Sequence, residues 1–310
     1  MGRRGLKAWW GICLALATLG NGAVADGDFG HKILGTVGLD AGSQQPEGVY
    51  AGDRYIQFDA DRYILGNGQT APVGDLSVRA FANVFGLSAT TRWSDEGPYY
   101  SASLAAPIAG LHLRSTQPLK DMDQVGLGDL YFEPLKLGWR LPRLDITTSF
   151  SLYAPTGQLN RKGLAQPQWS EQVSLGGTVF FDDARSFRLS ALTSYNIYQR
   201  KEHIDITRGD SVQIQGGLGA RVFSLFDLGV TGYGLWQVAK DEGSALPAVA
   251  YGQRERAAGL GPEIGIMIPD LRSKVTARYE WDLWSRSRLE GQVLVVSWSV
   301  LALAPGESQP

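Results

Sequence analysis

Apolar and polar residues alternate with a period of two along much of this 310-residue chain, and no other feature constrains its fold more. Near the C-terminal end, for example, Ala277, Tyr279 and Trp281 share one face, whereas Arg278 and Glu280 share the other. Successive side chains of a β-strand point to opposite sides of the sheet. The pattern therefore predicts strands with one apolar and one polar face, and we find no sustained helical periodicity beside it.

The strands that the alternation predicts are long. We expect about twelve of them, many with ten to fourteen residues. Strands of soluble proteins most often have about five or six residues, whereas a tilted strand needs about nine to eleven to cross a bilayer. The lengths therefore favour strands that cross a membrane. The predicted strands are residues 49–62, 75–93, 99–116, 126–140, 143–155, 171–182, 186–199, 211–223, 226–238, 256–268, 271–282 and 290–303.

The connections between these strands alternate between short and long from residue 140 onward. Barrels of bacterial outer membranes show this asymmetry, because their periplasmic turns are tight and their external loops are longer. The sequence thus predicts an all-β fold, a transmembrane antiparallel up-and-down β-barrel, with a secreted or periplasmic β-sandwich as the alternative. The short connections are residues 141–143, 182–185, 224–226 and 269–271, and the long ones are residues 156–170, 200–210, 239–255 and 283–289.

The first 25 residues have the three parts of a secretory signal peptide. Basic residues precede an apolar stretch from Ala8 to Leu19, and the segment closes on an A-x-A cleavage site from Ala23 to Ala25. The only cysteine, Cys13, lies within this segment, so we expect a mature outer-membrane protein without disulfides. The expected parts are a signal peptide (1–25), a periplasmic N-terminal segment (26–48), the outer-membrane barrel (49–303) and a C-terminal tail (304–310).

Aromatic residues gather beside the predicted connections. Membrane barrels carry such rings at both interfaces with water, where their amphipathic character suits the headgroup level. We therefore expect an aromatic girdle at each end of the barrel. The candidate girdle residues are Trp93, Tyr99, Tyr100, Trp139, Phe181, Phe187, Phe223, Phe226, Trp236, Trp281 and Trp284.

If the apolar face contacts lipid, the polar face lines the lumen. A barrel of about eight strands is filled by its side chains, so about twelve strands predict a narrow and partly occluded lumen. Its charges either satisfy one another as a packing network or define a permeation path. The candidate lumen-lining residues are Arg79, Asp129, Glu133, Lys136, Arg140, Arg221, Glu263, Lys274, Arg278 and Glu280.

Pro134 interrupts one of the predicted strands. The apolar set of that strand changes phase after Pro134, from Leu130 and Phe132 to Leu135 and later residues. Because proline cannot donate a hydrogen bond to the sheet, we expect a β-bulge that absorbs one extra residue there.

Catalysis has little support in the residues. The three histidines are His31, His112 and His203, and the chain contains no G-x-S-x-G, H-E-x-x-H or Walker motif. We therefore expect no enzyme activity, no catalytic or metal-ligating residue and no cofactor. With 29 basic and 31 acidic residues, the formal charge of −2 argues against binding to nucleic acid.

The run from Val125 to Gly157 resembles a known family of outer-membrane β-barrels, named for a "MetA-pathway of phenol degradation". Looser similarity continues from this run to the last predicted strand. The resemblance implies an outer-membrane barrel that takes up hydrophobic or aromatic compounds, and it implies no catalytic residue. The residues that carry it are Gly128, Asp129, Leu130, Tyr131, Pro134, Gly138, Trp139, Tyr153, Ala154, Pro155, Thr156 and Gly157.

These observations lead to one functional expectation and two competing ones. We expect an outer-membrane channel for the passive uptake of small hydrophobic or aromatic compounds, with outer-membrane lipid and these solutes as its partners. A closed structural or adhesive barrel whose loops bind a partner is the alternative. An outer-membrane lipid-modifying enzyme comes third, and the sequence sets no oligomeric state.

Overall fold

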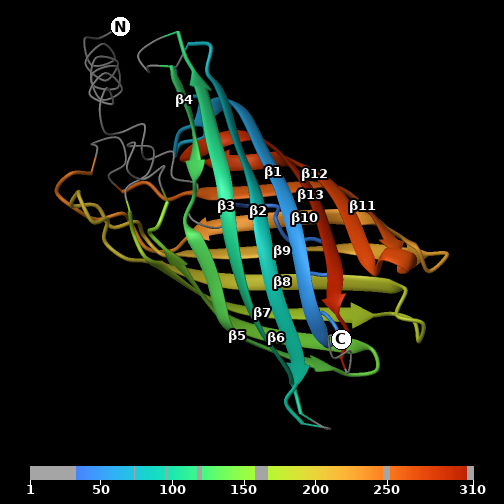
Figure 1. Ribbon diagram of the computed structural model, residues 1–310. Coiled ribbons are helices and arrows are strands. Elements are labelled where there is room, and N and C mark those ends of the chain that lie inside the picture. The colour runs from blue at the N-terminus through green and yellow to red at the C-terminus, as the bar shows by residue number, and fades with distance from the viewer. Residues whose placement is uncertain are drawn as a thin grey trace, which may run out of the picture.

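The chain forms one closed antiparallel β-barrel in a computed structural model that describes residues 33–72, 74–94, 97–116, 121–157, 167–246 and 252–305 (Figure 1). The expected fold class is thereby confirmed. The described residues include no helix that is long and apolar enough to cross a membrane. The predicted signal peptide, residues 26–32 and residues 306–310 of the predicted tail lie outside the described residues.

Thirteen strand segments occupy the twelve positions of the barrel, because β4 and β5 both pair with β3. Strand β1 closes the barrel by pairing with β13 on one side and β2 on the other. The strands are β1 (Gly48–Ile64), β2 (Ser77–Arg92), β3 (Tyr99–Arg114), β4 (Met122–Leu127), β5 (Leu130–Arg140), β6 (Leu144–Ala154), β7 (Ser170–Phe180), β8 (Phe187–Tyr198), β9 (Ser211–Val222), β10 (Phe226–Gln237), β11 (Arg256–Ile268), β12 (Ser273–Arg286) and β13 (Arg288–Leu303).

The two ends of the barrel differ in their connections. One end, which we call the turn side, has short connections and includes the single 3-10 turn of the described residues, η3 (Pro269–Leu271). The other end, which we call the loop side, has longer ones, except at Ser287 between β12 and β13. Turn-side connections include residues 141–143, 181–186, 223–225 and 269–272, and loop-side connections include residues 65–76, 199–210 and 238–255.

The bulge expected at Pro134 is present in β5. Against β6, the register passes from Phe132 directly to Leu135, so β5 carries one extra residue at this point. Because the backbone nitrogen of proline has no hydrogen to donate, an interruption at this residue costs the sheet fewer hydrogen bonds than an interruption elsewhere. The bulge leaves Glu133 and Lys136 on the inward face of the strand, on either side of the extra residue.

The connection between β12 and β13 is much tighter than the sequence predicts. Strand β12 continues to Arg286 and β13 begins at Arg288, so Ser287 alone joins them, with a φ of 55°. The long loop expected at residues 283–289 is therefore wrong. Polar residues at the end of a barrel are compatible with a strand that extends into water, so their polarity does not distinguish strand from loop.

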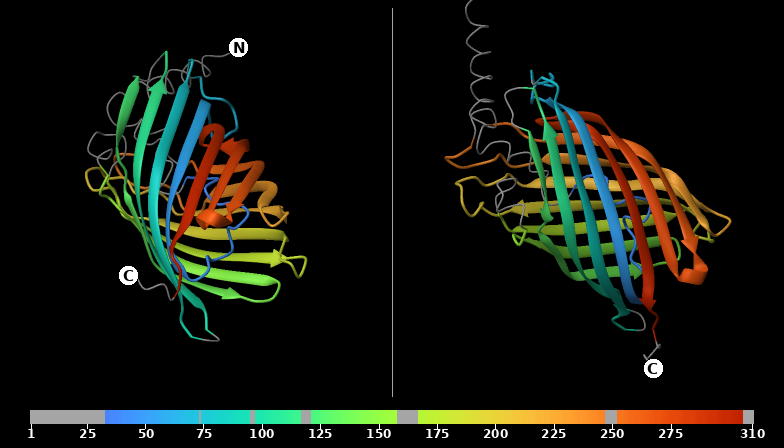
Figure 2. Two further views of the ribbon diagram at one scale, coloured as in Figure 1. Left: turned by 45° about the vertical axis from the view of Figure 1, so that its right-hand side comes forward. Right: turned by 45° about the horizontal axis from the view of Figure 1, so that its top comes forward.

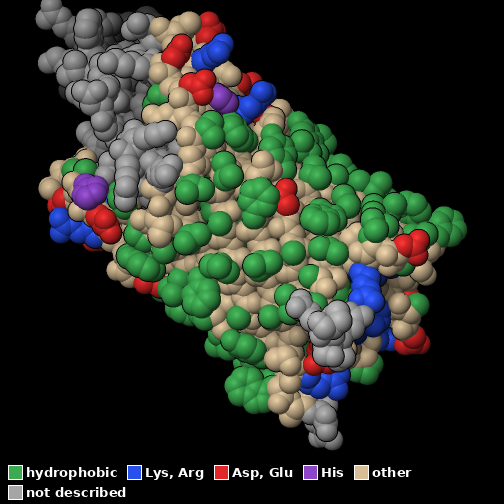
Figure 3. All heavy atoms as spheres, in the orientation of Figure 1, with side chains coloured by type: hydrophobic (Ala, Val, Ile, Leu, Met, Phe, Trp, Pro, Cys, Tyr) green, Lys and Arg blue, Asp and Glu red, His purple; other side chains and the backbone are tan. Residues whose placement is uncertain are grey.

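Exposed apolar side chains cover the outer face of the strands (Figure 3). Leu175 is 62% exposed, Ile264 is 53% exposed and Leu104 is 49% exposed, each in the middle part of its strand. Soluble monomers rarely present a continuous apolar surface of this kind to water. Lipid tails are the surroundings that this outer face fits.

Most candidate girdle residues lie on the outer surface. Tyr100 packs edge-to-face against Trp93, with ring centroids 6.1 Å apart. Tyr99 differs, because its ring lies 5.1 Å from the guanidinium carbon of Arg140 and on the inward face of β3. Trp284 is half-buried at the loop side. The exposed members are Trp93, Trp139, Phe181, Phe187, Phe223, Phe226, Trp236 and Trp281. Their role as a girdle in lipid stays a prediction.

Candidate functional site

The lumen holds a stretch of the chain itself. Residues 33–47, which we call the plug, run inside the barrel before β1 begins (Figure 2). The sequence suggests a periplasmic location for residues 26–48, whereas the described part of that segment bonds to the inner wall. These bonds include Thr36 N–H to Gln215 Oε1 (3.0 Å), Leu39 N–H to Glu263 Oε2 (3.2 Å), Gly42 N–H to Ser190 Oγ (2.7 Å) and Gln44 Nε2 to Ser101 Oγ (3.0 Å).

Leu39 anchors the plug in a hollow of the wall. Its side chain has no exposed surface, and it lies against Gly217, Gly219 and Gly229 on two adjacent strands. A Cβ atom placed on Gly219 or Gly229 would come within 2.7 Å of the Leu39 Cδ2 atom. These positions need glycine because any side chain there would occupy the volume of Leu39. The glycine-rich inner faces of β9 and β10 therefore form a socket for one leucine, which we call the Leu39 socket.

We expect Leu39→Ala to loosen the plug without dismantling the barrel. Truncating a fully buried leucine costs about 2–5 kcal/mol, and about 2 kcal/mol corresponds to roughly a 30-fold change in an equilibrium constant. Hydrogen exchange of the plug amides from Thr36 to Gly42 should therefore accelerate by about 30-fold or more. Leu141→Ala, at an exposed turn-side position, is the matched control and should leave exchange unchanged. Equal exchange in both variants would contradict the socket.

A buried ion pair holds the middle of the plug. Arg278 and Glu263 are 5% and 3% exposed, and Arg278 Nε lies 2.9 Å from Glu263 Oε2. The same guanidinium donates to the backbone oxygen of Gly35 (2.8 Å), while Glu263 accepts the N–H of Leu39. Both charges thus form a further hydrogen bond with the plug, and such bonds help a buried pair to offset the cost of desolvation.

A second group of charges surrounds the plug at the turn side. Asp40 of the plug lies between Arg188 of β8 and Lys274 of β12, and Arg188 Nη2 is 3.0 Å from Asp40 Oδ1. Both cations also contact Asp227, at 3.1 Å and 2.7 Å, and Arg221 binds Asp227 through two nitrogens at 2.9 Å and 3.0 Å. We call these five residues the mouth cluster, because four of them lie within two residues of the turn-side end of a strand.

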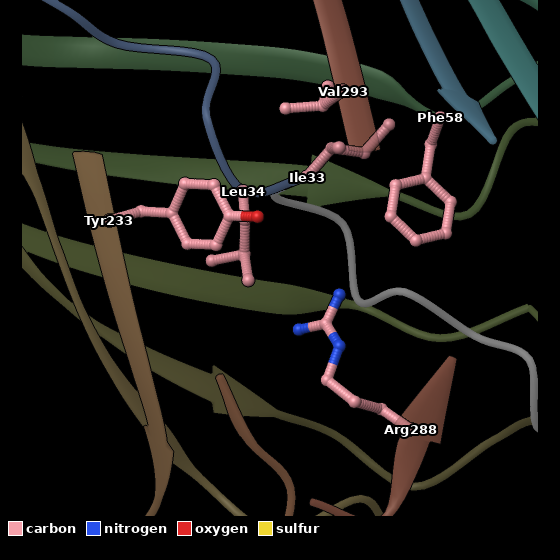
Figure 4. Close-up of a pocket in the computed structure, with 6 residues that line it drawn as sticks. All are labelled: Ile33, Leu34, Phe58, Tyr233, Arg288 and Val293. Carbon is pink, nitrogen blue, oxygen red and sulfur yellow. The ribbon is translucent and has the colours of Figure 1, made fainter. Parts of the chain in front are cut away.

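One side of the loop-side half of the lumen is apolar, along β1, β2 and β13 and the loop-side ends of β10 and β11, whereas β7 to β9 present buried polar side chains there, among them Gln172, Asn196 and Gln213. Phe58 on β1 is 5% exposed, and Val293 and Val295 on β13 are 2% and 1% exposed, all on inward faces. A small pocket lies where this half meets the start of the plug, with the Tyr233 ring and the Arg288 guanidinium beside it (Figure 4). The buried apolar cluster consists of Leu34, Ile56, Phe58, Ala60, Leu76, Val78, Leu113, Tyr233, Leu235, Ala257, Val293 and Val295.

Most of the charged residues expected in the lumen do face it. Glu133 accepts a hydrogen bond from Ser103 (3.2 Å), Lys136 lies on the inward face of β5, and Asp129 accepts the N–H of Gly157 (2.8 Å) at the break between β4 and β5. The six that gather around the plug are Arg140, Arg221, Glu263, Lys274, Arg278 and Glu280. That any of them defines a permeation path stays a prediction.

Arg79 does not line the lumen. Its neighbour Val78 faces inward at 3% exposure, whereas the Arg79 side chain is 57% exposed on the outer face. There Arg79 Nε lies 2.6 Å from Asp59 Oδ1, and Asp59 also accepts a hydrogen bond from Gln57. The hydroxyl of Tyr55 donates to Gln57 (2.6 Å), which extends the polar row along β1. From Tyr55 to Asp59, the polarity of β1 is thus inverted relative to the rule that polar residues face inward.

The apolar side of the loop-side lumen is the functional feature that the sequence does not reveal. Phe58 and Asp59 alternate as regularly as any other apolar and polar pair. The pattern therefore predicts a strand, but it does not show which face of the strand points into the lumen. The only local signal is the apolar pair Ile33 and Leu34, which precedes β1 without belonging to a strand. Its partners across the lumen are not visible in one sequence.

The histidines give no catalytic arrangement in the described part of the chain. His112 lies on the outer face of β3, with Nδ1 2.9 Å from Asp123 Oδ1 and its ring stacked on Phe81. His203 is exposed in a loop-side connection, and His31 lies outside the described residues. Within the described ranges, no group of three or more His, Cys, Asp or Glu side chains could hold a metal ion.

A closed barrel with an apolar outer face, tight turns at one end and an internal plug defines the class of transmembrane β-barrels. The chain belongs to the family described as "Putative MetA-pathway of phenol degradation", which matches residues 60–298. No curated protein matches the sequence.

Two solved structures show the same fold. The COG4313 outer membrane channel from Pseudomonas putida F1 has a TM-score of 0.71 and 15% sequence identity, over 83% of this chain and 97% of that one. The translocator domain of the autotransporter NalP from Neisseria meningitidis has a TM-score of 0.50 and 12% identity, over 84% and 91%. At these identities the similarity establishes the barrel architecture.

Proposed function

We propose that the protein is a bacterial outer-membrane channel for the passive uptake of small hydrophobic or aromatic compounds. The turn side would face the periplasm and the loop side the exterior, as in other barrels of this type. Membership of a family named for phenol degradation supports the solute class, and the barrel fold supports the location. The absence of enzyme activity is part of the same proposal.

The apolar part of the inner wall, in the loop-side half of the lumen, carries this proposal. A barrel needs an apolar outer face to enter lipid, but nothing in membrane insertion requires Phe58, Val293 and Val295 to face inward. Their burial in the lumen gives a hydrophobic solute a path on which it need not regain its hydration shell. The charged turn-side half and the plug then form the barrier that the solute meets last.

The plug implies that the structure represents a closed state. Twelve strands leave a narrow lumen, and the plug crosses it with bonds to β3, β8, β9 and β11. Passage of a solute would require residues 33–47 to shift from this position. The same occlusion is the observation that favours the second candidate function, a closed structural barrel whose external loops bind a partner.

A pair of identical substitutions on one strand tests the path. Val293→Thr places a hydroxyl on the inner apolar wall, whereas Val296→Thr places it on the outer face, where Val296 is 36% exposed. We expect Val293→Thr to slow phenol entry into vesicles with a lipopolysaccharide outer leaflet by about two- to threefold, because an unpaired polar group disfavours the apolar path. Val296→Thr should leave the entry rate unchanged. Equal rates in both variants would place the route elsewhere.

A further inference from the structure

The plug presents the mouth cluster with a carboxylate and an apolar side chain on consecutive residues. Leu39 fills the glycine-lined socket, and Asp40 sets one carboxylate oxygen on Arg188 and the other on Lys274. Arg188 Nε also faces the backbone oxygen of Leu39 at 3.3 Å. The wall thus contacts this pair of residues as it would contact a small organic acid, with the acid group and the hydrocarbon group held in adjoining places.

The cations of the site have a partner on the wall in addition to their contacts with the plug. Arg188 is 3% exposed and Lys274 is 17% exposed, and each also forms an ion pair with Asp227, which has no exposed surface. Arg221 binds the same Asp227 from β9. Asp40 is the member of the group that comes from the plug; its side chain is 49% exposed and it lies outside any strand.

Charge makes this site an anion site once the plug is displaced. The wall contributes three cations and one carboxylate, so its formal charge is +2 without Asp40 and +1 with it. Partly buried cations that lose a hydrogen-bonded anion strongly favour another one. The two cations approach different oxygens of one carboxylate, which suits a planar acid.

We infer that Arg188, Lys274 and the Leu39 socket form a binding site for hydrophobic carboxylates, which the plug itself fills in the closed state. This inference rests on the proposed channel function, and it narrows the solute class to molecules that join an acid group to an apolar group the size of a leucine side chain or an aromatic ring. A solute of this kind competes with Leu39 and Asp40, and its binding favours the open position of the plug.

Calorimetric titration of the detergent-solubilised protein with sodium benzoate, at constant ionic strength, tests the site. We expect Asp40→Asn to bind benzoate at least tenfold more tightly than the unmodified chain, because the internal competitor is weakened. Lys274→Gln should abolish binding, whereas Lys240→Gln, an equal charge change at an exposed loop position, should not alter it. Acetate and benzyl alcohol, which each lack one half of the ligand, should bind at least tenfold more weakly than benzoate.

A second measurement follows the plug directly. The mature chain has no cysteine once Cys13 is removed with the signal peptide, so Ser43→Cys gives a single label site on the plug. Benzoate should speed maleimide labelling of this cysteine at least fivefold, with saturation, and the added change Lys274→Gln should remove that dependence. Retention of the folded band in heat-modifiability gels shows that each variant is a barrel.

The outcomes separate this inference from the proposed function. If the plug-deleted barrel conducts ions but benzoate binds equally to the unmodified chain, Asp40→Asn and Lys274→Gln, the site is refuted and the channel stands. If benzoate binds as expected while no variant conducts, the site stands and the channel function fails. Tight binding of benzyl alcohol would also overturn the inference, because it would show that the acid group is not recognised.

Discussion

Deletion of residues 33–45 is expected to convert a barrel with low conductance into an open pore. The plug is held by several hydrogen bonds of about 0.5–1.5 kcal/mol each, by the Leu39 socket and by two groups of ion pairs. Every 1.4 kcal/mol that favours the closed position reduces the open fraction about tenfold. Single-channel recordings in planar bilayers should therefore show at least about a tenfold gain in mean conductance.

The matched control keeps the length of the plug and removes its fit. A variant with residues 33–45 in scrambled order retains the volume of the segment but takes Leu39 and Asp40 away from their partners. We expect its conductance to fluctuate between the closed level and the level of the deletion variant. An unchanged, low conductance in the deletion variant would mean that the side chains of the wall close the lumen by themselves, and it would favour the closed structural barrel.

The strands could be predicted from the sequence because their signal is local. Each of the twelve predicted strands has a counterpart in the barrel, and even the bulge at Pro134 follows from one residue and a change of phase. Alternation requires only that neighbouring side chains point to opposite faces of the sheet, and this can be recognised from adjacent residues in the sequence. The length of the strands further predicted that they cross a membrane, because strands of soluble proteins usually have fewer residues.

The lumen could be predicted only in part because its contacts are not local. Glu263 and Arg278 lie opposite each other on adjacent strands, so their meeting follows from antiparallel pairing. Asp40 and Lys274 are 234 residues apart, and beyond the apolar pair Ile33 and Leu34 no local signal shows that the segment before the first strand folds inward. The rule that charges face inward is wrong for Arg79, because its partner Asp59 holds it on the outer surface.

Variants of the ion pair between Arg278 and Glu263 can separate an effect on stability from an effect on permeability. We expect Arg278→Ala to cost about 3–5 kcal/mol of unfolding free energy, because it leaves the buried carboxylate of Glu263 without its partner. Urea unfolding in lipid vesicles measures this loss. Arg143→Ala, which breaks the exposed pair with Asp183, is the control and should have little effect. Replacing both Arg278 and Glu263 by methionine should restore most of the lost stability.

The conductance of the same variants decides between the two candidate functions. Arg278 donates to Gly35 and Glu263 accepts from Leu39, so the paired methionine variant keeps a stable barrel whose plug has lost both bonds. If the protein is a channel closed by its plug, this variant should conduct more than the unmodified chain even though its stability is nearly restored. If the barrel is structural, Arg278→Ala should lower stability and every variant should remain closed, because no path would lie behind the plug.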